Sequence, residues 1–243
     1  LALICCGLWG SAFPCIKIGY RLFQIPAEDA GAQIVFAGFR FFLAGILALL
    51  LGSLLEKRIL LPPKAAAGKI VKLSMMQTVF QYLFFYLGLA HTTGVKGAII
   101  VGSNSLVTIL IAACLFRQEQ LTGRKLAGCL AGLAGVVAAN LAQGGLSFSF
   151  TFNGEGFVFL SVISYGFSSV FLKKYSRDYD PVLLSGWQFV LGGGILALMG
   201  TLMGGRLEYM TWQGILMLLY LGFLSAVAYS LWGILLKYNP VSK

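Results

Sequence analysis

The chain has 243 residues, of which 58% are hydrophobic and 11% charged, and its mean hydropathy is +0.87. Because a soluble domain carries roughly a quarter of charged residues, this composition excludes an ordinary soluble protein and predicts an all-α integral membrane protein. The net charge of +10 could indicate nucleic-acid binding, but the basic residues lie in short gaps between apolar runs. That pattern is typical of membrane-protein loops, so we expect no nucleic-acid partner.

Eight apolar runs are long enough to cross a membrane, which takes about 20 residues. In chain order they are residues 1–18, 34–55, 70–90, 95–116, 125–141, 156–172, 182–203 and 212–236. Asn239 and Pro240 would open a ninth helix. The gaps are short, so we expect a multi-span helical bundle of antiparallel neighbours with no soluble domain inserted.

Small residues punctuate several of these runs. Gly128 and Gly132 form a small-xxx-small pair in the fifth run, which predicts close approach of another helix, and Gly192, Gly193 and Gly194 lie in the middle of the seventh. The cysteines have no metal-ligand spacing and are expected to pack inside helices; they are Cys5, Cys6, Cys15, Cys114 and Cys129. We expect no metal, no cofactor and no enzymatic activity, because the chain has one histidine and no nucleophile–base pair.

Three segments recur in the same order along the chain. The pairs are residues 9–17 with 165–173, 39–45 with 187–193, and 82–96 with 229–243, at offsets of 156, 148 and 147. This predicts two five-helix units, residues 1–142 and 153–243, of which the second is incomplete. Since five is odd, the second unit would enter the membrane inverted, as in many secondary transporters. Its missing part would be a ninth and a tenth helix, so we expect the chain to be part of a longer protein.

The basic residues are distributed unevenly between the two sides of the predicted bundle. Thirteen of the 18 lie on one side and four on the other, while Arg40 lies inside the second run. The positive-inside rule therefore predicts a cytoplasmic N-terminus, in a cytoplasmic membrane.

Several short motifs resemble those of the EamA-like family of the drug/metabolite transporter superfamily. They are Trp9-Gly10 with Lys17, Arg40-Phe41 with Ala44, the corner GLAHTTGVKGAI at residues 88–99, Glu119-Gln120-Leu121-Thr122, and the spaced Gly128 and Gly135. The chain departs from the family pattern at Leu106, where a proline is common, and at Phe116-Arg117-Gln118.

The resemblance implies ten helices in two inverted halves, with both termini cytoplasmic. It implies movement of small metabolites, often export of amino acids or related compounds. Small multidrug exchangers of the same superfamily need a carboxylate in the first helix, and this chain has none there. Proton-coupled exchange of cationic drugs is therefore not expected.

Candidate site residues are polar or aromatic side chains inside the apolar runs. Arg40 is the one mid-helix charge; it could contact an anionic group in a cavity, or extend outward to the membrane surface. The full candidate set for a substrate cavity is Trp9, Ser11, Arg40, Gln77, Gln81, Tyr82, Asn104, Ser105, Thr108, Ser164, Tyr165, Tyr229 and Trp232. Hydrogen bonding between helices would use the same residue types. Glu119, between Arg117 and Arg124, could form an ion pair at a gate or be a solvated loop charge.

These features favour a secondary transporter of small metabolites such as amino acids, a probable exporter, that works by alternating access. Its expected partners are a small-molecule solute and the lipid bilayer. Three alternatives stay open: transport of drugs or nucleotide-sugars, a channel, and a membrane enzyme or scaffold that does not transport. Phosphorylated substrates would favour several cavity cations, whereas Arg40 is the only mid-helix charge, and enzymes usually cluster His, Asp or Glu.

Overall fold

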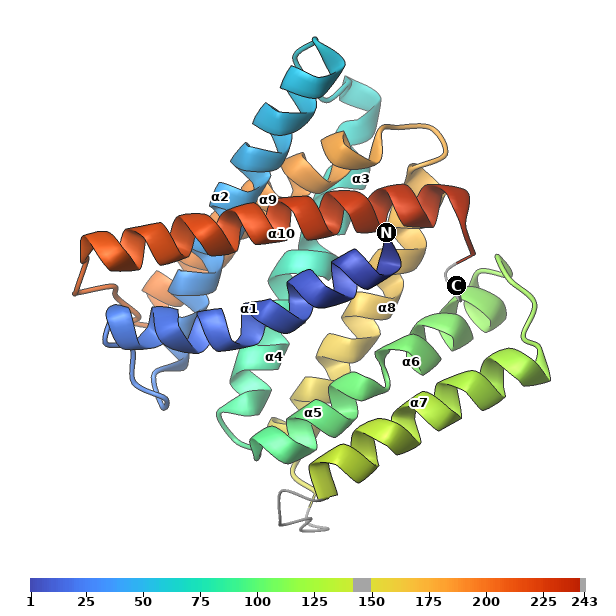
Figure 1. Ribbon diagram of the computed structural model, residues 1–243, viewed down its shortest axis with the longest axis horizontal. Helices are drawn as coiled ribbons and strands as arrows, with labels where there is room; N and C mark the ends of the chain where they lie inside the picture. The colour runs from blue at the N-terminus through green and yellow to red at the C-terminus, as the bar shows by residue number, and fades with distance from the viewer. Residues whose placement is uncertain (142–149, 241–243) are drawn as a thin grey trace.

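The computed structural model describes residues 1–141 and 150–240, and in this part of the chain it is a helical bundle without β-strands (Figure 1). Helices lie at all eight predicted positions. Their bounds are α1 Ala2–Leu22, α2 Ala30–Glu56, η1 Lys64–Ala66, α3 Ala67–Leu73, η2 Ser74–Phe80, α4 Gln81–Leu89, α5 Gly94–Gly102, α6 Asn104–Leu110, η3 Ile111–Leu115, α7 Gly123–Leu141, η4 Phe152–Gly156, α8 Phe157–Tyr175, α9 Pro181–Leu202 and α10 Trp212–Tyr238. Residues 241–243, part of the third recurring segment and of the predicted ninth helix, lie outside the described residues.

Polar caps explain where the long helices begin. The Asp29 carboxylate accepts the Ala32 N–H at 2.8 Å, so α2 starts at Ala30, four residues before the predicted start. Asp180 caps α9 in the same way, by accepting the Val182 N–H at 2.8 Å. These polar side chains supply acceptors for N–H groups that a helix start leaves unpaired.

Six helical segments in the described residues are long and apolar enough to cross a membrane. They are Ala2–Leu22, Ala30–Glu56, Gly94–Leu115, Phe152–Tyr175, Pro181–Leu202 and Trp212–Tyr238. The other two predicted spans are helical but more polar: residues 67–89 contain Lys72, Gln77 and Gln81, and α7 contains Arg124 and Lys125. Exposed side chains such as Leu54 and Leu198 give the bundle an apolar outer surface, as a membrane protein requires. The protein is thus a multi-pass membrane protein.

The antiparallel helices α2 and α9 make the most extensive helix–helix contact in the described bundle. A Cβ built at Gly31, near the start of α2, would lie 3.0 Å from the backbone N of Gly205, just beyond the end of α9. A Cβ at Gly52, near the end of α2, would lie 2.8 Å from a methyl group of Val182 at the start of α9. The two helices therefore run in opposite directions along their whole length.

Glycines allow this close approach, and the contacts are reciprocal. A Cβ at Gly45 of α2 would lie 2.6 Å from the Gly186 carbonyl oxygen of α9, and 2.5 Å from the Val190 N. A Cβ at Gly193 of α9 would lie 2.8 Å from the Gly38 carbonyl oxygen of α2. Because these neighbours are backbone atoms, a side chain at either glycine would push the helices apart.

The predicted close packing at the glycines of α7 is wrong. A Cβ built at Gly128, Gly132 or Gly135 would meet nothing within 4 Å. α7 lies at one edge of the bundle beside α5 and α6 (Figure 1), and its glycines border an open hollow. Spacing alone cannot tell whether a small-residue stripe meets a helix, because it does not say where the helix lies in the bundle.

Candidate solute-binding site

A cavity of about 260 Å³ lies in the bundle between α1, α2, α4, α5, α6, α8 and α10. Seven of the candidate residues line it: Trp9, Arg40, Gln81, Tyr82, Asn104, Tyr165 and Tyr229. They come from segments far apart in the sequence, which the crossing of α1 and α10 over the other helices brings together (Figure 1). The cavity therefore combines aromatic, amide and guanidinium groups in an otherwise apolar interior.

Aromatic rings from five helices pack around one another at the cavity. The hydroxyl groups of Tyr82 and Tyr229 are 2.9 Å apart and share a hydrogen bond. Trp9 packs edge-on against Tyr229, with ring centroids 5.5 Å apart, and Phe41 stacks on Phe189 at 5.1 Å. Rings in T-shaped and stacked contacts hold one another in place, which gives the cavity a rigid wall.

Arg40 is buried beside the cavity, with 4% of its surface exposed. Its Nε donates a hydrogen bond to Ser225 Oγ at 3.0 Å, and its guanidinium carbon lies 4.9 Å from the centroid of the Phe41 ring. Arg40 is ten residues after the start of α2, so at 1.5 Å per residue it lies about 15 Å along this helix. The interpretation in which it extends outward to the membrane surface is wrong in this structure.

No carboxylate neutralises Arg40. All eight acidic residues of the chain lie in the described part, and none of them lines the cavity or pairs with this guanidinium. Within residues 1–141 and 150–240, the polar contacts of the Arg40 guanidinium are a hydrogen bond to the Ser225 hydroxyl and a cation–π contact with the Phe41 ring. The cavity wall therefore carries an uncompensated positive charge.

Three polar atoms of cavity residues are buried without a hydrogen-bond partner among the described residues. They are Trp9 Nε1, Gln81 Oε1 and Asn104 Oδ1. A buried polar group without a partner destabilises a structure, and such groups are uncommon unless a ligand or water meets them. Ten further atoms of this kind among the described residues lie away from the cavity, so unpaired polar atoms are not confined to it.

Six candidate residues lie away from this cavity. Ser11 donates to the Leu8 carbonyl of its own helix at 2.8 Å, and Ser164 donates to the Met76 carbonyl at 2.6 Å. Ser105 borders the second hollow, beside α7. The remaining three, Gln77, Thr108 and Trp232, each keep a buried polar atom that has no partner in the described residues, but none of them lines the cavity.

The cavity also has lining residues that sequence reasoning missed: Ala12, Ile16, Phe85, Tyr86, Val101 and Ser161. Tyr86 follows Tyr82 by four residues on α4, so helical spacing could have identified it. Ala12 and Ile16 share the face of Trp9 in the same way. Apolar side chains such as Val101 carry no signal that separates a cavity wall from a lipid-facing surface.

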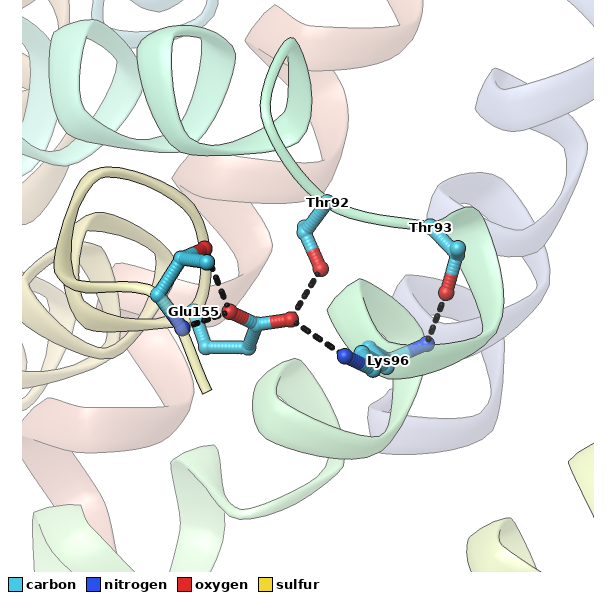
Figure 2. Close-up of polar contacts among 5 residues, drawn as sticks. Thr92, Thr93, Lys96 and Glu155 are labelled. Atoms are coloured by element: carbon cyan, nitrogen blue, oxygen red, sulfur yellow. Dashed lines mark hydrogen bonds and ion pairs between the residues drawn. The ribbon is translucent and has the colours of Figure 1, made fainter. Parts of the chain in front are cut away.

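A buried ion pair connects the corner before α5 with the start of α8 (Figure 2). Lys96 Nζ lies 2.8 Å from Glu155 Oε1, which also accepts from Thr92 Oγ1 at 2.7 Å. The other carboxylate oxygen accepts from the N–H and the hydroxyl of Thr151, each at 2.8 Å. The side chains of Lys96 and Glu155 are 11% and 8% exposed, so the pair is shielded from water.

A second buried carboxylate, Glu119, lies at the other end of α8. Its two oxygens pair with Lys173 Nζ at 3.0 Å and Lys125 Nζ at 3.1 Å, and its side chain is 3% exposed. Glu119 is therefore not a solvated loop charge, and it forms ion pairs with two lysines. The segment α5–α6–η3 runs alongside α8 in the same direction, and the two ion-pair clusters join the segments at both ends.

Comparison with known proteins agrees with this architecture. The sequence model that describes the EamA-like transporter family matches residues 1–141 and 152–243. A solved crystal structure superposes with a TM-score of 0.73 over 94% of this chain and 82% of the other, at 18% identity, which is a likeness of fold.

Three relatives were found among curated proteins, and two of them are named as transporters. A WAT1-related chloroplast protein of Arabidopsis thaliana is 28% identical over 61% of this chain and 38% of its own length. An uncharacterized transporter of Synechocystis is 26% identical over 76% of the chain and 58% of its own length. An uncharacterized transporter of Archaeoglobus fulgidus is 28% identical over 93% and 75%. The chain thus spans less than two thirds of the length of the first two relatives.

The family match covers nearly the whole described chain, on a fold of membrane-spanning helices around a cavity that has several polar side chains in its lining. The protein belongs to the EamA-like transporter family.

Proposed function

We propose that this protein is a secondary transporter that carries small metabolites, such as amino acids, across the cytoplasmic membrane by alternating access. The observation that carries the proposal is the cavity, because it lies inside the bundle and is lined by polar and aromatic groups from both ends of the chain. Its volume of about 260 Å³ is below the roughly 300–1,000 Å³ typical of sites for drug-sized ligands. It therefore suits a compact metabolite better than a nucleotide-sugar.

We further propose that residues 1–142 and 153–243 are inverted repeats whose seam holds this cavity. Residues separated by the sequence offsets of 147 and 148 meet each other: Tyr82 with Tyr229 through their hydroxyls, and Phe41 with Phe189 through stacked rings. Contacts between equivalent residues are expected where two units pack about a two-fold axis. The reciprocal glycine contacts between the antiparallel α2 and α9 support the same relation.

Two further parts of the proposal rest on charge and family. The excess of basic residues in one set of loops supports a cytoplasmic N-terminus. Export is the direction that we propose, since the family resemblance favours it. A cationic drug is a poorer candidate, because none of the eight acidic residues lines the cavity.

Reconstitution tests this proposal directly. Liposomes containing the purified full-length protein are loaded with a metabolite extract, and the solutes that leave are identified by mass spectrometry. We expect saturable loss of at least one small metabolite. Equal loss from protein-free liposomes for every solute would contradict the proposal.

A cavity-filling variant provides the matched control. Val101→Trp places a bulky ring at the cavity wall, so we expect the saturable flux to fall at least tenfold while the protein stays folded. Leu198→Trp makes a comparable addition on α9, where the side chain is 60% exposed to the outer surface, and should leave the flux unchanged. If both variants transported like the wild type, the solute path would lie elsewhere.

A further inference from the structure

We propose, building on the proposed transport function, that the cavity selects solutes with a net negative charge and binds their carboxylate at Arg40. Such a solute is a compact monocarboxylate with an apolar or aromatic body. The inference separates anions from the zwitterions and cations that a general metabolite carrier would also accept. It rests on three observations. Arg40 has N–H groups without an acceptor, no acidic residue lies in the described cavity lining, and the equivalent helix contact elsewhere in the bundle is made by a neutral residue.

Most N–H groups of the Arg40 guanidinium have no hydrogen-bond acceptor among the described residues. A guanidinium carries five N–H groups, and in residues 1–141 and 150–240 only Nε–H has an acceptor, the Ser225 hydroxyl. Ser225 in turn donates to the Leu221 carbonyl at 2.8 Å, which holds its oxygen toward Arg40. The terminal N–H groups can therefore form the paired contact that a guanidinium makes with a carboxylate.

Arg40 gives the cavity lining a positive charge, and no acidic residue is present among the described residues of this lining. An ionised side chain deep in a membrane protein is unfavourable unless a partner neutralises it. A monocarboxylate supplies that partner. A zwitterion would add an ammonium group, for which the cavity lining offers neutral amides such as Gln81 and Asn104 but no carboxylate.

A neutral copy of this contact indicates that packing does not need the charge. Ser225 follows Thr78 by 147 residues, and Gln188 follows Arg40 by 148, so these residues are equivalent in the two recurring units. Thr78 Oγ1 donates to Gln188 Oε1 at 2.9 Å, just as Ser225 and Arg40 are paired on the other side. A glutamine and a hydroxyl thus make the equivalent contact there, although Gln188 Nε2 is buried without a partner among the described residues. The contact itself therefore does not require an arginine.

The body of the solute would lie against apolar and aromatic walls. Trp9, Ile16 and Phe85 line the cavity together with Val101. These groups bind apolar surface and offer ring faces to an aromatic solute. A phosphorylated solute of higher charge would need further cations, and Arg40 is the only basic residue in the lining.

Binding of one isosteric series tests the inference. The probes are 3-phenylpropanoate, its neutral amide 3-phenylpropanamide, the zwitterion phenylalanine and the cation 3-phenylpropylamine. Affinities are measured by isothermal titration calorimetry on the full-length protein in nanodiscs, because a carboxylic acid also crosses bilayers unaided in its protonated form. Since hydrogen bonds between charged groups are roughly twice as strong as neutral ones, we expect the carboxylate to bind at least tenfold more tightly than each of the others.

Variants of Arg40 identify the group responsible. Arg40→Gln copies the neutral contact of Gln188 and should keep the fold, while it removes the preference for the carboxylate. Arg40→Lys keeps the charge and should keep most of the preference. Equal binding of carboxylate and amide by the wild type, a preference that survives in Arg40→Gln, or no binding of any probe would overturn the inference. The extract assay decides the transport proposal independently, because flux of a neutral or zwitterionic metabolite would preserve it.

Discussion

Gly45→Ala is expected to destabilise the protein strongly, by about 1–3 kcal/mol, because it overpacks the centre of the bundle. The new Cβ would lie 2.5 Å from the Val190 N and 2.6 Å from the Gly186 carbonyl oxygen. Both are backbone atoms of α9 and cannot rotate away as a side chain can. The helices would have to separate, and this would loosen the stacked rings of Phe41 and Phe189 between them.

Thermal unfolding in detergent, followed by size-exclusion chromatography, measures this effect. Gly128→Ala is the matched control, since it makes the same change on α7, where nothing lies within 4 Å of the new Cβ. In a helix, alanine is favoured over glycine by roughly 0.5–1 kcal/mol, so the control should be as stable as the wild type or slightly more. Equal melting temperatures for the two variants would contradict the antiparallel packing of α2 on α9.

Glu155→Gln is expected to lower the melting temperature clearly, because it removes one partner of an ion pair whose side chains are each about a tenth exposed. Lys96 would lose the charge it faces at 2.8 Å, and the new amide could not accept from all the donors that meet the carboxylate (Figure 2). The junction between the corner before α5 and the start of α8 would weaken. We expect lower stability and less folded protein at equal expression.

An exposed pair in the same protein is the control. Glu56 and Arg58 lie 2.6 Å apart, but their side chains are 33% and 66% exposed. Exposed ion pairs contribute about 0–1 kcal/mol, so Glu56→Gln should leave the melting temperature nearly unchanged. Lys96→Met combined with Glu155→Gln should recover part of the loss, since no charge is then left buried. If Glu155→Gln were as harmless as Glu56→Gln, the buried pair would not be joining these segments.

The helices could be predicted from the sequence because lipid imposes a simple rule. Every span needs a long apolar run, and the breaks between runs are marked by proline, glycine and charges. The starts were less accurate, since the side-chain cap of Asp29 adds four residues to α2. The third helix lies where it was predicted, over residues 67–89, but the π-helical stretch η2 in its middle has no clear sequence signal.

The candidate site was predicted less well, because residue type does not say which way a helix faces. Asn104 lines the central cavity while its neighbour Ser105 borders the hollow beside α7, since consecutive helical residues point about 100° apart. Gln77 and Gln81 are four residues apart, so they would share a face of a regular α-helix. The wider turns of η2 shift Gln77 away from the cavity that Gln81 lines.

Counterflow is the most direct test of a carrier. Liposomes containing the full-length protein are loaded with an isotope-labelled solute that the extract assay has identified, and its efflux is followed with and without unlabelled solute outside. Alternating access predicts faster efflux when the outside solute is present, because the loaded carrier returns in exchange, and it predicts saturation with concentration. Efflux that rises in proportion to the gradient and ignores the outside solute would contradict the account and indicate a channel.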